Sequence, residues 1–448
     1  MPDKRYEFTP RDGDCTKDLQ AAIDQCAGAD VTLVLCAGTH FCAGLELKSN
    51  LSMHLQEGAI LCMLDGYERY AKNTVGVIAE DSDRAMLVAS HQKNISLSGK
   101  GIIEAHGEAY IVGALEEMGT HIPAAKRPRT LVIEHCENFS LSDITIKDSP
   151  MWTIHMVNSR TVNIEHVCVD NDRKMPNTDG IVIDACEAVS ISHCSIATAD
   201  DGIVLKTSAK GNSLEPVGIC KAISVAHCTI ESHSCALKIG TESFGDFEAI
   251  NFTHCTIERS NRALGIFSRD GGNISNVNFS DISVDCHETP QGFWGSGEAI
   301  TVNCLDRRKE LPAGKIENIT FSNITGRMQG AINLYSDSPS GIDRIFFRSV
   351  ALEQVEGPYN SGRFDVRPTH FDLAPSPDAA GRANAFVKDE NGEVIGLVPY
   401  PDGQPGIFGR NINGLICENV EIKRPSPLPA GWNTNVFMMA KDESPLWT

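Results

Sequence analysis

Short runs in which apolar and polar residues alternate recur along most of the chain. Such a period of two is typical of β-strands that bury one face. Gly, Asn or Asp residues separate the runs, and a helical period of 3.6 is almost absent. Most runs follow one another after about 22 to 34 residues, which is the period of a solenoid. They begin at Asn94, Asn138, Thr161, Ala188, Ala222, Ala249, Val277, Asn318 and Asp343.

Units this short must stack to bury a core, so we expect one all-β domain over residues 1–448. The predicted architecture is a single-stranded right-handed parallel β-helix. Three units share a His-Cys pair at the same place, at residues 193–194, 227–228 and 254–255. A metal-binding ladder is one interpretation of these pairs. We favour the other, in which each Cys and the Ile two residues later point into the core.

The first 60 residues and two long insertions depart from the repeat. Leu19, Ile23 and Cys26 have helical spacing, which predicts an amphipathic helix over Thr16–Cys26 with Thr16 in an N-cap role. This helix is expected to cap the open end of the solenoid. The insertions at 108–130 and 358–414 are long enough to act as lids or contact surfaces.

Composition narrows the classes of partner. The 448 residues include 39 Lys and Arg against 59 Asp and Glu, a net charge of −20, which argues against nucleic acid and anionic membrane surfaces. No apolar run approaches the roughly 20 residues of a membrane span. The opening MPDKRYEFTP has no secretory signature, so we expect a cytoplasmic protein. The sixteen Cys are dispersed and include no CxxC pair, so we expect free thiols and no metal or other cofactor.

Acidic residues coincide in two successive units. Asn177-Thr178-Asp179-Gly180 precedes the run IVI, and Ala199-Asp200-Asp201-Gly202 precedes IVL. Asp179 and Asp201 are 22 residues apart, or one coil, so they should stand about 4.8 Å apart on one face with Asp200 beside them. Crowded carboxylates raise at least one pKa, which allows one to act as an acid and another to activate water in glycoside hydrolysis. Ordinary Asp-Gly turns and a calcium site are the alternatives.

These motifs resemble those of glycoside hydrolase family 28, the polygalacturonase-like enzymes with a pectin-lyase-like β-helix. The resemblance extends from DGDCTKDLQAAID at Asp12 to the coil near Ile422 and includes the NTD and DD signatures. It implies that Asp201 is the general acid and that Asp179 and Asp200 activate water, with inversion at the anomeric carbon.

Two family signatures are altered. Ser234-Cys235-Ala236 stands where the family has Gly-His-Gly, with His233 two residues before the Cys. Gly265-Ile266-Phe267 stands where the family has the Arg-Ile-Lys that binds the galacturonate carboxylate, so both cations are missing. The sequence therefore favours a neutral or differently placed sugar. The candidate substrate-binding residues are Asn177, Lys206, His233, Cys235, Lys238, Glu242, Phe267, Arg269, Asp270 and Trp294.

We expect an inverting, exo-acting hydrolase of pectin-type oligosaccharides, with the insertion at 358–414 blocking one end of the cleft. A β-helix lyase or glycosyl-transferring enzyme is the enzymatic alternative. A glycan-binding β-helix that has lost catalysis is the alternative from another class, because the His, Arg and Lys of the family are absent. The sequence leaves the oligomeric state open.

Overall fold

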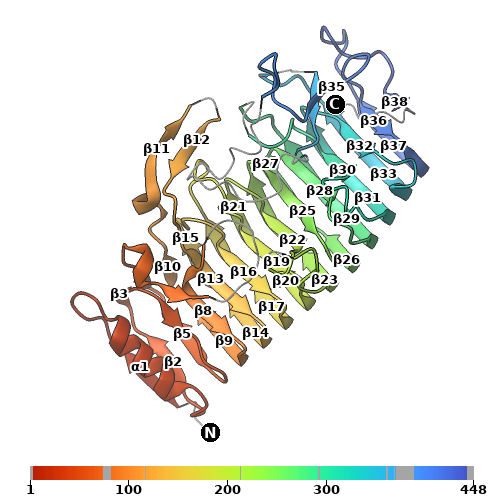
Figure 1. The fold of residues 1–448 in the computed structure, drawn as a ribbon. Coiled ribbons are helices and arrows are strands. Elements are labelled where there is room, and N and C mark those ends of the chain that lie inside the picture. The colour runs from red at the N-terminus through yellow and green to blue at the C-terminus, as the bar shows by residue number, and fades with distance from the viewer. Residues whose placement is uncertain are drawn as a thin grey trace.

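The computed structural model describes residues 4–73, 82–116, 118–211, 213–290, 293–359, 362–367, 369 and 388–440. Within these residues the chain winds into stacked coils that run from the N-terminal to the C-terminal end of an elongated molecule (Figure 1). A complete coil contributes three strands, one to each of three parallel columns, as β17, β18 and β19 do. This is the predicted right-handed parallel β-helix.

Two columns belong to one large sheet. The first column, which β1 (Arg5–Phe8) joins through β2, comprises β2 (Thr32–Leu35), β5 (Ser52–Leu55), β9 (Lys93–Gly99), β14 (Glu137–Ser142), β17 (Arg160–Glu165), β20 (Glu187–Ser192), β23 (Cys220–Ala226), β26 (Phe247–Thr253) and the leading halves of β29 (Ile274–Cys286), β31 (Ile316–Met328), β33 (Ile342–Gln354) and β37 (Ile412–Lys423). The second comprises β3 (Gly38–Cys42), β6 (Ala59–Met63), β10 (Ile102–Glu104), β15 (Thr145–Lys147), β18 (Cys168–Asp170), β21 (Ser195–Thr198), β24 (Thr229–Ser232), β27 (Thr256–Ser260) and the trailing halves of the same four strands.

The third column is a separate sheet, here called the site sheet. It comprises β4 (Leu45–Glu46), β8 (Arg84–Ser90), β13 (Arg129–Glu134), β16 (Ile154–Val157), β19 (Ile181–Asp184), β22 (Ile203–Thr207), β25 (Cys235–Ser243), β28 (Arg262–Ser268), β30 (Ile300–Cys304), β32 (Ile332–Ser336), β36 (Ile407–Arg410) and β38 (Phe437–Ala440), with β7 (Ala71–Lys72) antiparallel to β8.

Identical positions of successive coils form ladders through the interior. Phe252, Phe279 and Phe321 stack with ring centroids 4.7 and 5.0 Å apart, which is close to the spacing of the coils. Each buried apolar side chain of this kind contributes about 1.5–3 kcal/mol by leaving water. Cys194 and Cys228 lie in a similar inward ladder, which confirms the core interpretation of the Cys of the His-Cys pairs.

The His residues of these pairs lie on the outside. His166, His193, His227 and His254 are exposed, and their rings follow one another at 5.0, 4.9 and 5.0 Å. All four have a positive φ of 53 to 55°. The His-Cys phrase is therefore a turn with an exposed His followed by an inward Cys.

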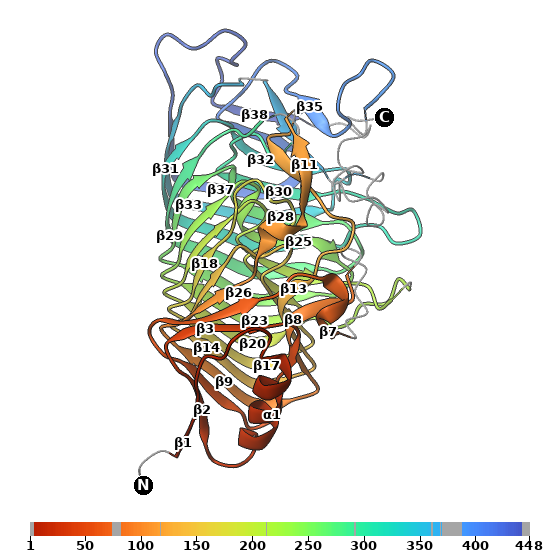
Figure 2. The same cartoon turned by 90° about the vertical axis from the view of Figure 1, so that its left-hand side faces the viewer.

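The helix α1 (Thr16–Cys26) has the predicted bounds and lies at the N-terminal end of the stack (Figures 1 and 2). It buries Leu19, Ile23 and Cys26, as the spacing indicates. The N-cap expectation for Thr16 is wrong, because Thr16 is the first helical residue. Its hydroxyl instead donates to Asp14 and accepts from the N–H of Ala43 at 2.7 Å.

Both insertions fold beside the coils. The first contains the 3-10 turn Gly107–Tyr110 and an antiparallel hairpin of β11 (Ile111–Leu115) and β12 (Thr120–Pro123), which stands away from the stack (Figure 1). The second contains the antiparallel pair β34 (Arg363–Asp365) and β35 (Leu397–Pro399). It is shorter than predicted, because β36 and the start of β37 are regular strands of the coils. Residues 370–387 of this insertion lie outside the described residues.

A further 3-10 turn spans Tyr67–Arg69 near the N-terminal end. Among the described residues, no helix has the length and apolar character to cross a membrane. All sixteen Cys lie within the described residues, and all are free thiols.

Candidate active site

The acidic motifs lie in the turns that lead from the second column into the site sheet. Asp179 precedes β19, and Asp200 and Asp201 precede β22. Ile181 pairs with Ile203, so Asp179 and Asp201, each two residues earlier, occupy the same position in adjacent coils. The structure therefore brings the three predicted carboxyl groups together. Asp179, Asp200 and Asp201 are only 3%, 6% and 2% exposed.

Asp201 is held by two donors from the next coil. The Lys238 ammonium donates to Oδ2 at 2.7 Å, and the Ser234 hydroxyl donates to Oδ1 at 2.9 Å. A Lys ammonium can only donate hydrogen bonds, so the oxygen that it contacts is an acceptor. Both carboxyl oxygens of Asp201 therefore act as acceptors in this structure.

Asp200 shapes the turn that carries both acids. Its Oδ1 accepts the backbone N–H of Asp201 at 3.0 Å. Its carbonyl oxygen accepts the hydroxyl groups of Thr198 and Ser232, both at 2.7 Å. The polar ends of β21 and β24 thereby fix the backbone from which the carboxylates extend.

Asp179 has different surroundings. Within the described part of the chain, its carboxyl group has no hydrogen-bond donor or cation at bonding distance. Burial, together with the negative charges of Asp200 and Asp201, raises the pKa of the Asp179 carboxyl well above its usual value. The two carboxyl groups thus have opposite surroundings, because a buried ammonium contacts that of Asp201 and none contacts that of Asp179 among the described residues.

Lys206 and Glu242 form a second charged pair at the site, with Nζ and Oε2 2.7 Å apart. Burial alone would lower the pKa of Lys206, but nearby carboxylates, Glu242 foremost, outweigh it and raise that pKa. Burial likewise opposes the ionisation of Glu242, yet the cations around it, Lys206 foremost, lower its pKa to about 2. Both groups are therefore charged near neutral pH.

An apolar floor adjoins these charges, and the sequence analysis did not identify it. Trp152 packs with Met151, Val182 and Val204 on the outer face of the site sheet. The Lys206 ammonium lies 5.2 Å from the centre of the Trp152 ring. The sequence could have placed Trp152 at the site, because Trp152 precedes β16 by two residues, just as Asp179 precedes β19 by two residues.

Two polar residues of the site were also missed. Ser234 was recorded only as part of an altered signature, yet it binds Asp201. Arg127, from the first insertion, donates to the Asn177 side-chain oxygen at 2.8 Å and to two backbone carbonyl groups. Asn177 is consequently a buried residue that anchors the turn before Asp179. No sequence signal connects Arg127 to Asn177, because the contact depends on the path of the insertion.

Four predicted substrate-binding residues are 0% exposed in this structure and contact other parts of the protein. The Cys235 thiol lies under the site sheet surface, near the Phe267 ring. The Phe267 ring is covered by Lys238, Arg262 and Arg269 at 5.2–5.7 Å. Arg269 donates to backbone carbonyl groups that include that of Val366 at 3.1 Å.

Asp270 is the fourth of these residues. It forms ion pairs with Arg307, at 2.6 Å, and with Arg308. Its carboxylate thus binds the loop after β30.

The altered signature at 265–267 is one packing unit. A Cβ at Gly265 would lie 2.6 Å from the Phe267 ring and 2.7 Å from the Cys235 sulfur. The Phe267 ring therefore fills the space that a side chain at residue 265 would need. An Arg at that position is incompatible with the observed packing.

His233 and Trp294 lie beside the site. The half-buried His233 ring meets Phe293 edge to face, with centroids 6.3 Å apart. Burial lowers the pKa of His233. The Trp294 ring is partly exposed, and the Arg367 guanidinium lies 5.2 Å from its centre.

The insertion at 358–414 covers the site sheet on the C-terminal side of the carboxylates. Residues 362–367, here called the strap, include Asp365, which pairs with Arg262 at 2.8 Å. Phe364 packs on Tyr400 and Phe408, each at 5.0 Å. The ion pair of Asp365 with Arg262, the aromatic cluster of Phe364 and the hydrogen bond from Arg269 to Val366 thus hold the strap on the sheet.

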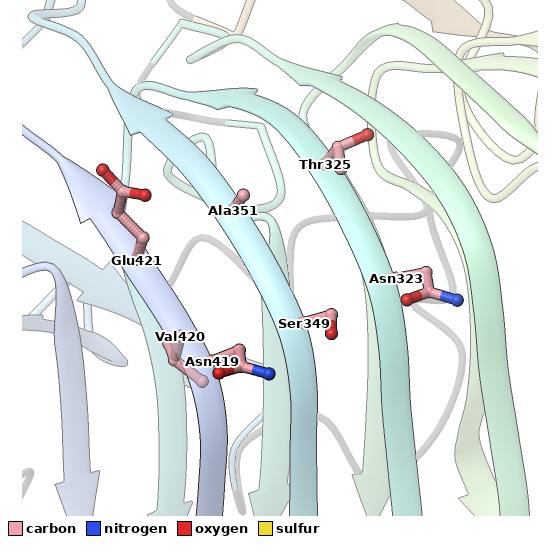
Figure 3. A pocket seen from close by; sticks show the side chains of 7 residues that line it. All are labelled: Asn323, Thr325, Ser349, Ala351, Asn419, Val420 and Glu421. Carbon is pink, nitrogen blue, oxygen red and sulfur yellow. The ribbon is translucent and has the colours of Figure 1, made fainter.

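A separate groove of about 510 Å³ lies on the large sheet (Figure 3). It crosses β31, β33 and β37, where Asn323, Ser349 and Asn419 form one row and Thr325, Ala351 and Glu421 another. Glu421 is its one lining carboxylate among the described residues. The groove therefore lacks the paired acids that hydrolysis requires.

Comparison with known proteins identifies relatives of this arrangement. Residues 68–358, more than half of the chain, match the model of the family described as Glycosyl hydrolases family 28. A probable polygalacturonase of Arabidopsis thaliana is 32% identical over 127 residues, or 28% of this chain and 25% of the relative. A polygalacturonase of Persea americana is 26% identical over 144 residues, or 30% of this chain and 31% of the relative. The chain thus spans less than a third of either relative's length.

Solved structures share the fold. The family 28 exopolygalacturonase of Yersinia enterocolitica aligns with a TM-score of 0.62 at 15% identity, over 98% of this chain and 78% of that one. At this identity the likeness extends to the β-helix alone.

Proposed function

Because the chain belongs to glycosyl hydrolase family 28, we propose that it is an inverting glycoside hydrolase that cleaves pectin-type oligosaccharides. The observation that carries the proposal is the group of Asp179, Asp200 and Asp201 on adjacent coils. Glycoside hydrolysis needs one carboxyl group that gives a proton to the leaving oxygen and one that activates water. Opposite surroundings of neighbouring carboxyl groups are how proteins separate these roles.

We propose a specificity that differs from plain galacturonate. The residues that replace Arg-Ile-Lys carry no charge, and the buried Phe267 ring occupies the space beside Gly265. Lys238 lies in register with Gly265 but is paired with Asp201. These contacts favour a neutral sugar, or an acidic sugar bound in another orientation, at this subsite.

We propose an exo mode. The strap lies over the site sheet at Arg262 and Arg269, on the C-terminal side of the carboxylates. A cleft closed on one side accepts a chain end and not the middle of a polymer. The sixteen free thiols fit a reducing compartment, so we propose that the protein acts on imported fragments in the cytoplasm.

Turnover of an oligosaccharide panel tests the proposal. Wild type is incubated with pectin-derived and neutral plant oligosaccharides, and NMR reads the anomer of the first product. We expect an inverted product and loss of turnover in Asp201→Asn. Asp143→Asn is a matched control, because Asp143 is exposed in a turn with φ of 63°, which Asn also adopts.

Other outcomes identify the alternatives. An unsaturated product that absorbs in the ultraviolet would show a lyase. Binding of a panel member without turnover would show a glycan-binding protein that has lost catalysis, a reading favoured by the burial of Cys235 where the family has His. A retained anomer would contradict inversion.

A further inference from the structure

The groove on the large sheet is separate from the carboxylates of the candidate active site. It lies on β31, β33 and β37, at the turn between the first and second columns. Asp179 and Asp201 lie instead in turns that lead into the site sheet. With a volume of about 510 Å³, the groove is within the size range of pockets that bind small ligands. It can therefore hold a ligand independently of the active site.

The groove is hollow because its middle strand carries short side chains. This strand is β33, which contributes Ser349 and Ala351 (Figure 3). The strands on either side carry longer side chains at the same positions and form two walls. The walls are Asn323 and Thr325 of β31, and Asn419 and Glu421 of β37. The backbones of two strands separated by a third are about 10 Å apart, which leaves room for a sugar ring between the walls.

The polar side chains of the groove are available to a ligand. Thr325, Ser349 and Asn419 are exposed, and within the described part of the chain none of their side chains forms a hydrogen bond. The side-chain amide of Asn323 donates to Asp281 at 3.0 Å, and its side-chain oxygen stays open as an acceptor. Hydroxyl and amide side chains supply both donors and acceptors. The groove therefore matches a ligand whose own groups both donate and accept.

The row of contacts along this turn position ends at the groove. In the preceding coils the position is filled by the stacked His rings, the last of which is His254. His254 lies 3.8 Å from Asp281, which in turn accepts the hydrogen bond from Asn323. Ser349 comes next in the row and makes no such contact. The side chains of the earlier coils thus bind one another, whereas those of the groove are open to a ligand.

The main chain of the groove is already paired. β33 is hydrogen-bonded to β31 on one side and to β37 on the other, and β31 also pairs with β29. A peptide that adds a strand to a sheet needs the free main-chain groups of an edge strand. The floor of the groove and its wall on β31 offer side chains instead, which favours a ligand recognised through its hydroxyl groups.

The charge of the groove favours a neutral ligand. Glu421 is exposed, and no cation is among the described residues that line the groove. Arg348 and Lys423 lie on the same strands, but they pair with Glu418 at 3.4 Å and with Glu353 at 3.5 Å. A sugar carboxylate would meet the negative charge of Glu421 without a lining cation to offset it. The Glu421 carboxylate can instead accept hydrogen bonds from neutral hydroxyl groups.

We propose that this groove is a second, non-catalytic binding site that takes a neutral sugar unit of a glycan. The sugar ring lies over Ala351, and the two walls bind its hydroxyl groups from both sides. The site performs no chemistry, so it goes beyond the proposed hydrolase function and does not depend on turnover at the carboxylates.

Methyl NMR tests for binding at the groove. The protein, with isotope-labelled Ala and Val methyl groups, is titrated with galactotriose, xylotriose and arabinotriose, and separately with trigalacturonate. We expect at least one neutral trisaccharide to shift the signals of Ala351 and Val420, which both line the groove, and trigalacturonate to leave them unchanged. Asp201→Asn should show the same shifts, so loss of the hydrolase reaction leaves this test intact.

Two results of the titration would overturn the proposal. One is that none of the three neutral trisaccharides shifts Ala351. The other is that trigalacturonate shifts it more strongly than they do, which would show an acidic ligand.

Variants of the groove locate the bound sugar. Ala351→Tyr fills the groove and should weaken binding by about tenfold or more, read from the Val420 signals. Glu421→Gln keeps the shape of the wall and should also weaken binding about tenfold, because hydrogen bonds to a charged group are the stronger ones. Both variants should turn over a short substrate of the active site at the wild-type rate.

Thr256→Tyr is the matched control. Thr256 is exposed in β27 and occupies the position of Ala351 three coils earlier, outside the groove. Tyr is favoured in strands, so both Tyr variants should fold, and thermal unfolding checks this. If Ala351→Tyr does not fold, Glu421→Gln decides. Wild-type affinity in Glu421→Gln, or an equal loss of affinity in Thr256→Tyr and Ala351→Tyr, would overturn the proposal.

Discussion

At the scale of single residues, the raised pKa of the Asp179 carboxyl group makes the stability of the fold depend on pH. Its raised pKa, caused first by burial, means that the folded protein binds this proton more tightly than the unfolded chain does. The stability that it contributes is present at low pH and is lost as the pH rises from the usual Asp value of 3.8 toward the folded pKa. A site that keeps three carboxyl groups together thus destabilises the fold at neutral pH.

Asp179→Asn should therefore stabilise the protein, and more at pH 8 than at pH 5. Each unit of raised pKa corresponds to about 1.4 kcal/mol. Thermal unfolding at several pH values measures the effect, with Asp143→Asn as the exposed control. A gain that is independent of pH would contradict an Asp179 that holds a proton in the fold.

Periodicity predicted which of these residues meet, but not which of them a ligand can reach. Asp179 and Asp201 were predictable because one coil separates them and the register conserves their position. The burial of Arg269 and Asp270 was not predictable, because their partners, the strap and the loop after β30, are distant in sequence. The contact between Lys238 and Asp201 could not be predicted from the sequence either. Spacing along a strand indicates the face on which a residue lies, but not the direction in which a long side chain extends.

At the scale of elements, the turn between the first and second columns restricts which residues can occupy one position of each coil. The turn residue at position 193 has φ of 55°, and the same turn carries His227, Asn323 and Ser349 in other coils, with φ of 53 to 56°. Left-handed backbone costs most L-residues about 1–2 kcal/mol, and Asn less. The repeated sequence segment thus encodes a turn as well as a strand.

His193→Asn should leave the free energy of unfolding within about 0.5 kcal/mol of wild type, whereas His193→Val should lower it by about 1–2 kcal/mol. Chemical denaturation measures both values. Thr229→Val is the matched control, because Thr229 is exposed within β24, where Val is favoured. Equal losses for Asn and Val would show that the stacked imidazole rings, and not the backbone, stabilise this turn.

The elements themselves were more predictable than their insertions. The bounds of α1 follow from three apolar residues at helical spacing, and the strands follow from the period of two. The end of the second insertion was misplaced because Gly and Pro residues in PDGQPGIFGR suggest a loop, whereas β36 pairs along β32 and β38. Pairing with both neighbours determines this strand more strongly than its local composition does.

At the scale of the whole molecule, both insertions and both acidic turns lie along one edge of the site sheet. The first insertion leads into β13, the acidic turns into β19 and β22, and the strap belongs to the connection into β36. All four follow the second column and precede a strand of the site sheet. The stack therefore provides a rigid row of strands, and the connections at one edge enclose the carboxylates.

Asp365 holds the strap in this arrangement. Its buried carboxylate pairs with Arg262 at 2.8 Å and with Arg367 at 2.9 Å, and it accepts the Gly295 N–H at 2.6 Å. Burial opposes its ionisation, but Arg367 and Arg262 lower its pKa. Removing one partner from a buried ion pair costs about 3–5 kcal/mol, because the other charge is left unpaired.

Asp365→Asn should therefore open the strap locally and not unfold the coils. We expect faster proteolysis at the strap and, if the strap enforces the exo mode, a shift from monomeric to longer products. Arg363→Gln is the matched control, because Arg363 lies in the same strap and its pair with Glu393 is partly exposed and worth at most about 1 kcal/mol. Rapid cleavage of the strap with an unchanged distribution of product lengths would show that the exo mode has another cause.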